Sequence, residues 1–182
     1  MLELGVEIEA TERWVDSVVI GLNLCPFAKA VRAKGQIRYR SSLAASNREL
    51  LTELQAELEV LHAADPSLLD TTLLVHPHVL CDFHDYNAFL VEAGALLRRM
   101  RLEGELQIAG FHPDYCFGDC DADDPANYTN RSPYPMLHLL REASVSRAVD
   151  SFPDAASIYQ RNIQTLRALA PEALQQLRRP AR

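Results

Sequence analysis

Residues 71–78 read Thr-Thr-Leu-Leu-Val-His-Pro-His, a run of β-branched and apolar residues that ends at a proline. Asp70 stands directly before the run, so strand-breaking residues bound it on both sides. This pattern predicts a short buried strand over residues 71–75. The segments on either side of the strand carry helical patterns, and this alternation decides the fold class.

Helical spacing of apolar residues precedes and follows the predicted strand. Ser46 and Glu49 form a capping box, and leucines then recur at steps of three and four residues to position 61, which predicts a helix to about residue 64. The same spacing returns over residues 85–100. We therefore expect the strand at residues 71–75 to lie between two amphipathic helices.

The earlier and later parts of the chain continue the alternation. Residues 8–24 carry a helical stripe of valines and a leucine, and Pro26 predicts a break after it because proline cannot sit deep inside a helix. Residues 36–42 alternate polar and apolar side chains, which predicts a strand with one wet face. Residues 106–111 predict a third strand, in which Gly110 indicates a bend or a close backbone approach.

Two C-terminal helices complete the prediction. Ser132 as a cap and Pro133 at the first helical position predict a fourth helix that runs to about Val149. Ile158 and Leu166 belong to the inward stripe of a fifth helix, which Pro171 breaks.

This order of elements predicts an α/β fold, because strands separated by single helices usually pair in parallel with right-handed crossovers. We expect one compact domain over residues 1–182, with a small, mainly parallel sheet of about three strands and helices packed on it. No repeat or low-complexity tract interrupts the sequence.

Composition excludes several classes of function. The net charge is −7 and no basic stripe is present, which argues against a nucleic-acid partner. No apolar run approaches membrane-spanning length, and the first nine residues carry acidic side chains where a signal peptide has basic ones. We therefore expect a cytoplasmic protein without a membrane partner, whose four cysteines are reduced.

Two of the three predicted strands end in similar motifs. The second strand is followed by His76-Pro77-His78, and the third by His112-Pro113-Asp114. Because ligands of open parallel sheets bind outside the carboxyl ends of the strands, we expect these side chains to converge on one edge if the strands are neighbours. His112 and Asp114, with His76 as a further ligand, could then hold a divalent metal or supply acid–base groups; alternatively, His-Pro only terminates the strands.

The segment around the predicted fourth helix adds more candidates. His138 and Glu142 are four residues apart, so a helix would place both on one face, as a metal-ligating pair or as an imidazole oriented by a carboxylate. Alternatively, His138 and Glu142 form an ordinary surface ion pair without a functional role. Arg131 precedes the predicted helix start, where an arginine fork suits a phosphate or carboxylate group.

Three further patterns are weaker. The acidic run at 118–124 resembles the opening of a calcium loop, but it lacks the required glycine at its sixth position and the glutamate at its twelfth. His112, Cys116 and Cys120 have zinc-like spacing without a paired short-spacing motif. Cys25 lies near a predicted helix start that could activate a thiol, and it also fits a small buried apolar residue.

Four stretches of the chain carry a resemblance to a known family. They are Asn-Leu-Cys-Pro-Phe-Ala at 23–28, Thr-Thr-Leu-Leu-Val-His-Pro at 71–77, Phe-His-Pro-Asp-Tyr at 111–115 and Asn-Tyr-Thr-Asn-Arg-Ser-Pro-Tyr-Pro-Met-Leu-His at 127–138. With them the chain resembles, over nearly its whole length, the bacterial family catalogued as domain of unknown function 1415.

The resemblance implies no activity, cofactor or catalytic residue, because none is established for the family. Cys116, Cys120 and much of the acidic run do not match the family pattern, which weakens the zinc and calcium hypotheses. The candidates inside its motifs are Cys25, His76, His112, Asp114, Asn130, Arg131, His138 and Glu142.

Our leading hypothesis is a hydrolase or group transferase that acts on a small anionic molecule. The expected catalytic residues are His112, Asp114, His138 and Glu142, with a divalent metal as a possible cofactor. The expected substrate-binding residues are Asn130, Arg131, Tyr115 and Tyr134. The alternatives are a non-catalytic module that binds a small ligand or a partner through Tyr115, Tyr128 and Tyr134, and a thiol redox protein that uses Cys25.

Overall fold

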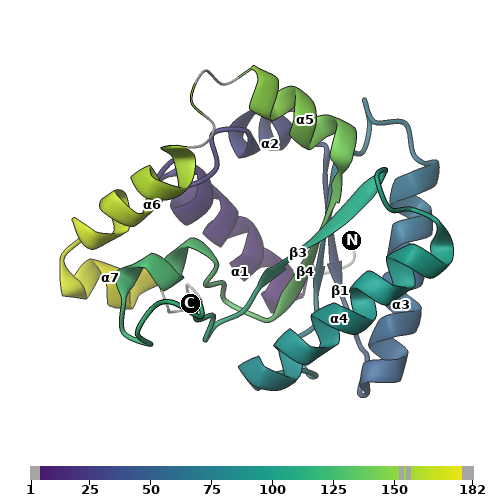
Figure 1. Cartoon of the computed structure of the whole chain (residues 1–182), viewed down its shortest axis with the longest axis horizontal. Coiled ribbons are helices and arrows are strands. Elements are labelled where there is room, and N and C mark those ends of the chain that lie inside the picture. Colours follow the sequence, from purple (N-terminus) through teal and green to yellow (C-terminus); the bar gives the residue numbers. More distant parts are fainter. Residues whose placement is uncertain (1–4, 152–153, 155–156, 178–182) are drawn as a thin grey trace.

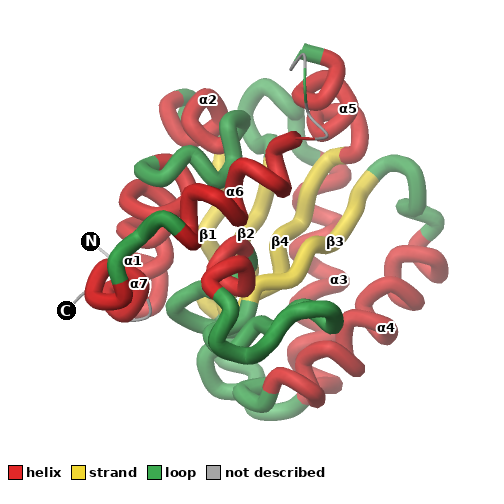
Figure 2. The backbone as a smooth tube through the Cα atoms, turned by 60° about the vertical axis from the view of Figure 1, so that its left-hand side comes forward, coloured by secondary structure: helices red, strands yellow, loops and turns green. Residues whose placement is uncertain are grey.

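The fold is organised around one four-stranded sheet (Figure 2). The computed structural model describes residues 5–151, 154 and 157–177. The strands are β1 (Ile37–Ser41), β2 (Thr71–Val75), β3 (Leu106–Phe111) and β4 (Met136–Arg141). Their order across the sheet is β1-β2-β4-β3. Because β4 is antiparallel to both of its neighbours, β1, β2 and β3 all run in one direction.

Helices cover both faces of the sheet. They are α1 (Val6–Trp14), the π-helix η1 (Val15–Ile20), α2 (Ala28–Ala33), α3 (Asn47–Ala63), α4 (Phe83–Met100), the 3-10 helix η2 (Pro125–Thr129), α5 (Glu142–Asp150), α6 (Ile158–Arg167) and α7 (Pro171–Leu177). In the edge-on view of Figure 1, α3 and α4 lie on one side of the sheet, and α1, α6 and α7 lie on the other. The α/β prediction is confirmed, but the sheet has four strands instead of about three, and two of its three strand pairs are antiparallel.

Each face of the sheet has its own apolar core. The larger one packs the leucines of α3 and α4 against inward side chains of β2, β3 and β4, including Leu74 and Leu137. The second packs α1, η1 and α6 against the opposite side chains of the same strands, including Leu73 and Met136. Residues that alternate along β2 therefore point into different cores, and β2 is buried along its whole length, as its sequence predicted.

The predicted fourth helix over residues 132–149 is wrong in its first half. Residues 136–141 form β4 at the centre of the sheet, and only residues 142–150 are helical. The reason is physical: Met-Leu-His-Leu-Leu-Arg is a short apolar run that fits a strand buried on both faces as well as a helix. Pro135 also disfavours helical backbone at Tyr134, and Ser132 donates to the Tyr134 carbonyl in a turn instead of capping a helix.

Other local predictions are confirmed. The amide of Glu49 donates to Ser46 Oγ at the start of α3, as the capping box requires. The N-terminal helix breaks before Pro26, although its second half is a π-helix rather than an α-helix. A short α2 then follows. Within the described residues, no helix is both long and apolar enough to cross a membrane.

Gly110 lies where another part of the chain approaches the β3 backbone. The Tyr86 hydroxyl passes over it to donate to the Met136 carbonyl at 2.8 Å. A Cβ at position 110 would lie 2.7 Å from the Tyr86 hydroxyl oxygen. The close approach predicted from this glycine is therefore present, and it is made by a buried side chain of α4.

We predict that Gly110→Ala lowers the free energy of unfolding by about 1–3 kcal/mol, because the added methyl group overpacks a buried site. Gly118→Ala is the matched control, since a Cβ there has no neighbour within 4 Å. Urea denaturation measures both variants. Adding Tyr86→Phe to Gly110→Ala should recover part of the loss, and an unchanged stability of Gly110→Ala would contradict the steric explanation.

Candidate functional site

His76 and His112 lie at the same edge of the sheet. They follow the parallel strands β2 and β3, and both are fully buried. Both rings pack against Tyr86 of α4, with centroid distances of 5.9 Å for His76 and 5.1 Å for His112. The topology thus brings together the two strand-end imidazoles that the sequence singled out.

Both rings form hydrogen bonds with backbone carbonyls of the loop that follows β2. His112 Nε2 donates to the Leu80 carbonyl at 3.1 Å, and His112 Nδ1 accepts from the Asp114 amide at 3.0 Å. His76 Nδ1 donates to the Val79 carbonyl at 3.0 Å. These partners assign one proton to each ring. Leu80 has a positive φ of 58°, so the two imidazoles hold a turn that a leucine rarely adopts.

Burial keeps these two histidines neutral. It lowers the pKa of His76 to about 4, against a weaker opposing effect of the hydrogen bond to Val79. Burial also lowers the pKa of His112. A protonated His112 could not accept from the Asp114 amide. The main role of the pair in this structure is therefore to fix the 77–81 loop.

The predicted metal site does not fit this geometry. His112 has no ring nitrogen left for a metal, because backbone groups occupy both, and Asp114 is exposed while His76 is fully buried. Across the described residues, no three His, Cys, Asp or Glu side chains gather in an arrangement that could hold a metal ion. This finding covers the predicted His112–Asp114–His76 set and the His112–Cys116–Cys120 set alike.

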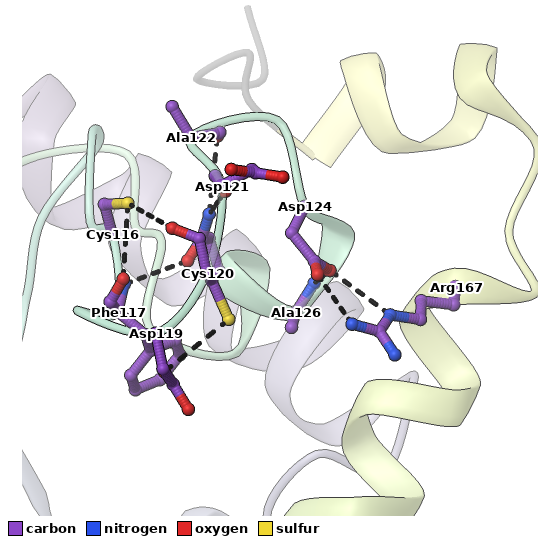
Figure 3. Close-up of polar contacts among 10 residues, drawn as sticks. Cys116, Phe117, Asp119, Cys120, Asp121, Ala122, Asp124, Ala126 and Arg167 are labelled. Atoms are coloured by element: carbon purple, nitrogen blue, oxygen red, sulfur yellow. Dashed lines mark hydrogen bonds and ion pairs between the residues drawn. The ribbon is translucent and has the colours of Figure 1, made fainter.

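The acidic segment is anchored rather than simply solvated (Figure 3). The buried Asn127 accepts from the Phe117 amide at 3.0 Å and donates to the Asp121 carbonyl at 2.8 Å. Asp124 caps η2 through the Ala126 amide and pairs with Arg167 of α6 at 2.6 Å. The sequence analysis did not identify Asn127 as an anchoring residue. The pattern that could have indicated this role is an asparagine beside a loop of small and acidic residues, whose backbone groups need hydrogen-bond partners.

Arg131 is buried at the base of this segment. Its Nε donates to the Tyr115 carbonyl at 3.0 Å, and its Nη2 donates to the Ala122 carbonyl at 2.7 Å. Its guanidinium carbon lies 4.9 Å from the centroid of the Tyr128 ring. Nη1 is covered and has no partner. No helix begins beside Arg131, so the predicted contribution of a helix dipole is absent.

The other predicted substrate-binding residues have structural contacts. Asn130 Nδ2 donates to the Gly110 carbonyl at 3.0 Å, and the Asn130 carbonyl accepts from the His112 amide at 3.2 Å. The Tyr115 ring packs against Phe83. Tyr134 is half-buried beside the second core. Asn130 thus fastens the long β3–β4 connection to the end of β3.

His138 has a different environment from the fully buried His76 and His112. It lies on β4 and pairs across the sheet with Leu73 and Ala109. Its Nε2 is 2.7 Å from Thr71 Oγ1, and this hydroxyl donates to the Leu139 carbonyl at 2.6 Å. Because the only hydroxyl hydrogen is used in that way, Thr71 must accept from Nε2–H. The lone pair of His138 is then on Nδ1.

Of the two ring nitrogens of His138, Nδ1 is the accessible one. The His138 side chain is only half-buried, and protein atoms do not fully cover its Nδ1. Nε2 of His76, by contrast, is fully covered and has no partner among the described residues. Burial of the ring lowers the pKa of His138 to about 4, so the imidazole is neutral at physiological pH. Thr71 was missed by the sequence reasoning because only the β2–β4 register brings it to His138.

The predicted pairing of His138 with Glu142 on one helical face is wrong. β4 ends at Arg141 and α5 begins at Glu142, so the two residues belong to different elements. The Glu142 amide donates to the Glu105 carbonyl, which places this end of β4 beside the start of β3.

Cys25 lies between η1 and α2 and is half-buried. Its amide donates to the Val19 carbonyl, and its carbonyl accepts from the Ala28 amide. The capping residue of α2 is Phe27, so Cys25 does not occupy the helix start on which its predicted activation depended.

Comparison with known proteins gives one match. A family model described as "Protein of unknown function (DUF1415)" matches residues 6–176. No curated protein and no solved structure matches the chain.

We predict that the protein loses stability as the pH falls from about 6.5 to about 4. Unfolded histidine has its ordinary pKa of 6.5 and takes up a proton in this window, whereas folded His76 does not until about pH 4. His76 alone contributes about 3 kcal/mol, which is fully present above pH 6.5 and lost by about pH 4. His112 and His138 act in the same direction.

The variant His76→Asn tests this directly. Asparagine can donate to the Val79 carbonyl but cannot be protonated, so the slope of unfolding free energy against pH should fall by about 1.4 kcal/mol per pH unit. Urea denaturation at a series of pH values measures it. The exposed His78 supplies the control variant His78→Asn, because its side chain lies at the surface and not in the core. Equal slopes in wild type and His76→Asn would contradict the assignment.

Proposed function

The chain belongs to the DUF1415 family of proteins of unknown function, whose model covers residues 6–176, and from its own geometry we propose that it is a hydrolase or group transferase acting on a small anionic substrate. The observation that carries the proposal is the hydrogen-bonded pair of Thr71 and His138. It combines a fixed imidazole tautomer with an accessible lone pair, a combination that neither His76 nor His112 has.

A positioned imidazole of this kind suits general-base chemistry. Thr71 holds Nε2–H, so Nδ1 can take a proton from an attacking water or a substrate hydroxyl and later return it to the leaving group. Orientation of the base by a further group is the arrangement on which nucleophile activation generally depends. The Phe111 ring, 5.9 Å from the imidazole centroid, supplies an apolar wall beside it.

An anionic substrate would make His138 a stronger base than it is in the free protein. At about 4, it leaves the free imidazole neutral but makes it a weak base. A negative charge bound next to the ring favours its protonated form and so raises its pKa. The base would therefore gain strength only when an anionic substrate is in place.

The remaining predicted catalytic residues have different parts in this proposal. His112 is a positioning residue, since both ring nitrogens hold backbone groups. Asp114 is exposed at the same edge, and Glu142 begins α5 directly after β4. For Asp114 and Glu142, a catalytic role as acid or base stays a prediction. The cytoplasmic location also stays a prediction.

We predict that His138→Gln lowers the turnover of a responsive substrate between about 10²- and 10⁴-fold, the usual contribution of general-base catalysis. Glutamine can still donate to Thr71, so the fold should be kept. The measurement is a screen of chromogenic anionic esters and phosphate monoesters with both proteins. The kcat/KM of the wild type should fall as the pH drops below about 4, and the acid limb of kcat should lie at higher pH because bound anion raises the pKa.

Thr71 supplies the matched pair of variants. Thr71→Ser keeps the hydroxyl and should retain activity, whereas Thr71→Val removes it and should lower kcat. If no member of the panel is turned over, or if His138→Gln is as active as the wild type, His138 is not a catalytic base.

A second candidate function, a small-ligand-binding module, is favoured by a cavity of about 280 Å³ between α1, η1 and α7. Its lining is mostly apolar and includes Trp14, Val18, Pro133 and Leu177. Such cavities are typical of small-molecule sites, although this one is at the small end of their range. It contains no imidazole, so this function would be independent of His138.

Trp14 is the single tryptophan of the chain, and its fluorescence therefore reports on the cavity. We expect 8-anilinonaphthalene-1-sulfonate, a probe with apolar rings and one sulfonate group, to change Trp14 emission saturably. Ala10→Leu, which adds bulk to the cavity wall, should abolish the change. Emission that does not respond in the wild type would rule out this second function.

A further inference from the structure

Within the part of the chain that the structure describes, Arg131 is a buried cation without a carboxylate partner. Its side chain belongs to the most buried part of the protein, with a residue exposure of 7%. Two of its three guanidinium nitrogens are satisfied by the carbonyls of Tyr115 and Ala122. The third, Nη1, is covered by protein atoms and has no hydrogen-bond partner.

Every other arginine in the described part of the chain is more exposed than Arg131. Arg32 and Arg38, which have 33% and 41% of their side chains exposed, each pair with a carboxylate. Among the described residues, no acidic side chain lies within ion-pair distance of the buried Arg131. A buried charge that lacks a counter-ion is destabilising, and the face of Tyr128 offsets only part of that penalty.

We propose that Nη1 of Arg131 binds the oxyanion group of a small molecule, a carboxylate or a phosphate, beneath the 115–124 segment. The guanidinium is already oriented by its two carbonyl bonds, so a charge-assisted hydrogen bond from Nη1 would need no further ordering of the side chain. The site goes beyond the proposed hydrolase or transferase function and does not require His138 to act as a base.

The segment above Arg131 determines which anions can enter. Arg131 donates to the carbonyls of Tyr115 and Ala122, so both ends of the 115–122 segment lie against the guanidinium group. Asp119, Asp121 and Asp123 on this segment are exposed and repel extended polyanions. The site therefore takes a small, singly or doubly charged anion and not a nucleic acid.

Isothermal titration calorimetry with inorganic phosphate and, separately, with acetate tests the proposal. We expect saturable binding of at least one of them to the wild type, and the comparison distinguishes a phosphate site from a carboxylate site. Arg131→Lys should bind about tenfold more weakly or not at all, because lysine cannot replace the fork. Arg141→Lys is the matched control, since Arg141 also clasps backbone carbonyls but is less buried.

If Arg131→Lys does not fold, the site can still be located by hydrogen exchange of the wild type with and without phosphate or acetate. The bound anion should slow amide exchange within residues 115–124 and leave α3 and α4 unchanged. Absence of saturable binding, equal affinity of wild type and Arg131→Lys, or protection confined to another segment would each overturn the proposal. Phosphate binding without turnover of any substrate would keep this site and remove the proposed catalytic function.

Discussion

The insertion of β4 between β2 and β3 is the constraint on which the rest of the structure depends. An antiparallel strand at the centre of the sheet must begin at the edge where β2 and β3 end. The connection between β3 and β4 therefore stays at this edge and turns back on itself. Asn127, Asn130 and Arg131 hold it there through backbone groups, which is why these polar side chains are buried or half-buried.

The same constraint separates the three imidazoles of the sheet. His76 and His112 lie just past their strands and fix the 77–81 loop on the side of α4. His138 lies within β4 and points to the opposite core, where Thr71 orients it. All three are neutral for one reason, the loss of solvent around the ring, but only His138 keeps an accessible lone pair. Burial alone thus does not distinguish a structural histidine from a candidate base; the hydrogen-bond partners do.

Local patterns predicted much of the fold. The buried strand at residues 71–75, the capping box at Ser46 and the close approach at Gly110 all depend on neighbouring residues, and all are present. The strand at 136–141 was not predicted, because its apolar run is too short for periodicity to separate strand from helix. The sequence predicted the meeting of His76 and His112 for neighbouring strands, but β4 lies between β2 and β3, and the two rings share a contact with Tyr86 instead. The Thr71–His138 bond depends on the register of two strands far apart in sequence.

Helix α6, the second-last helix of the described chain, contacts two earlier segments. Asn162 donates to the Leu24 carbonyl, and Arg167 pairs with Asp124 at the start of η2. Leu24 and Asp124 are synthesised long before α6. Neither of these two contacts can form until the ribosome has added α6 to the nascent chain. The sheet and the α3–α4 layer can pack earlier, because all their residues precede position 142. During synthesis, the Arg167–Asp124 pair therefore forms after the bonds by which Asn127 and Arg131 already hold the 115–124 segment.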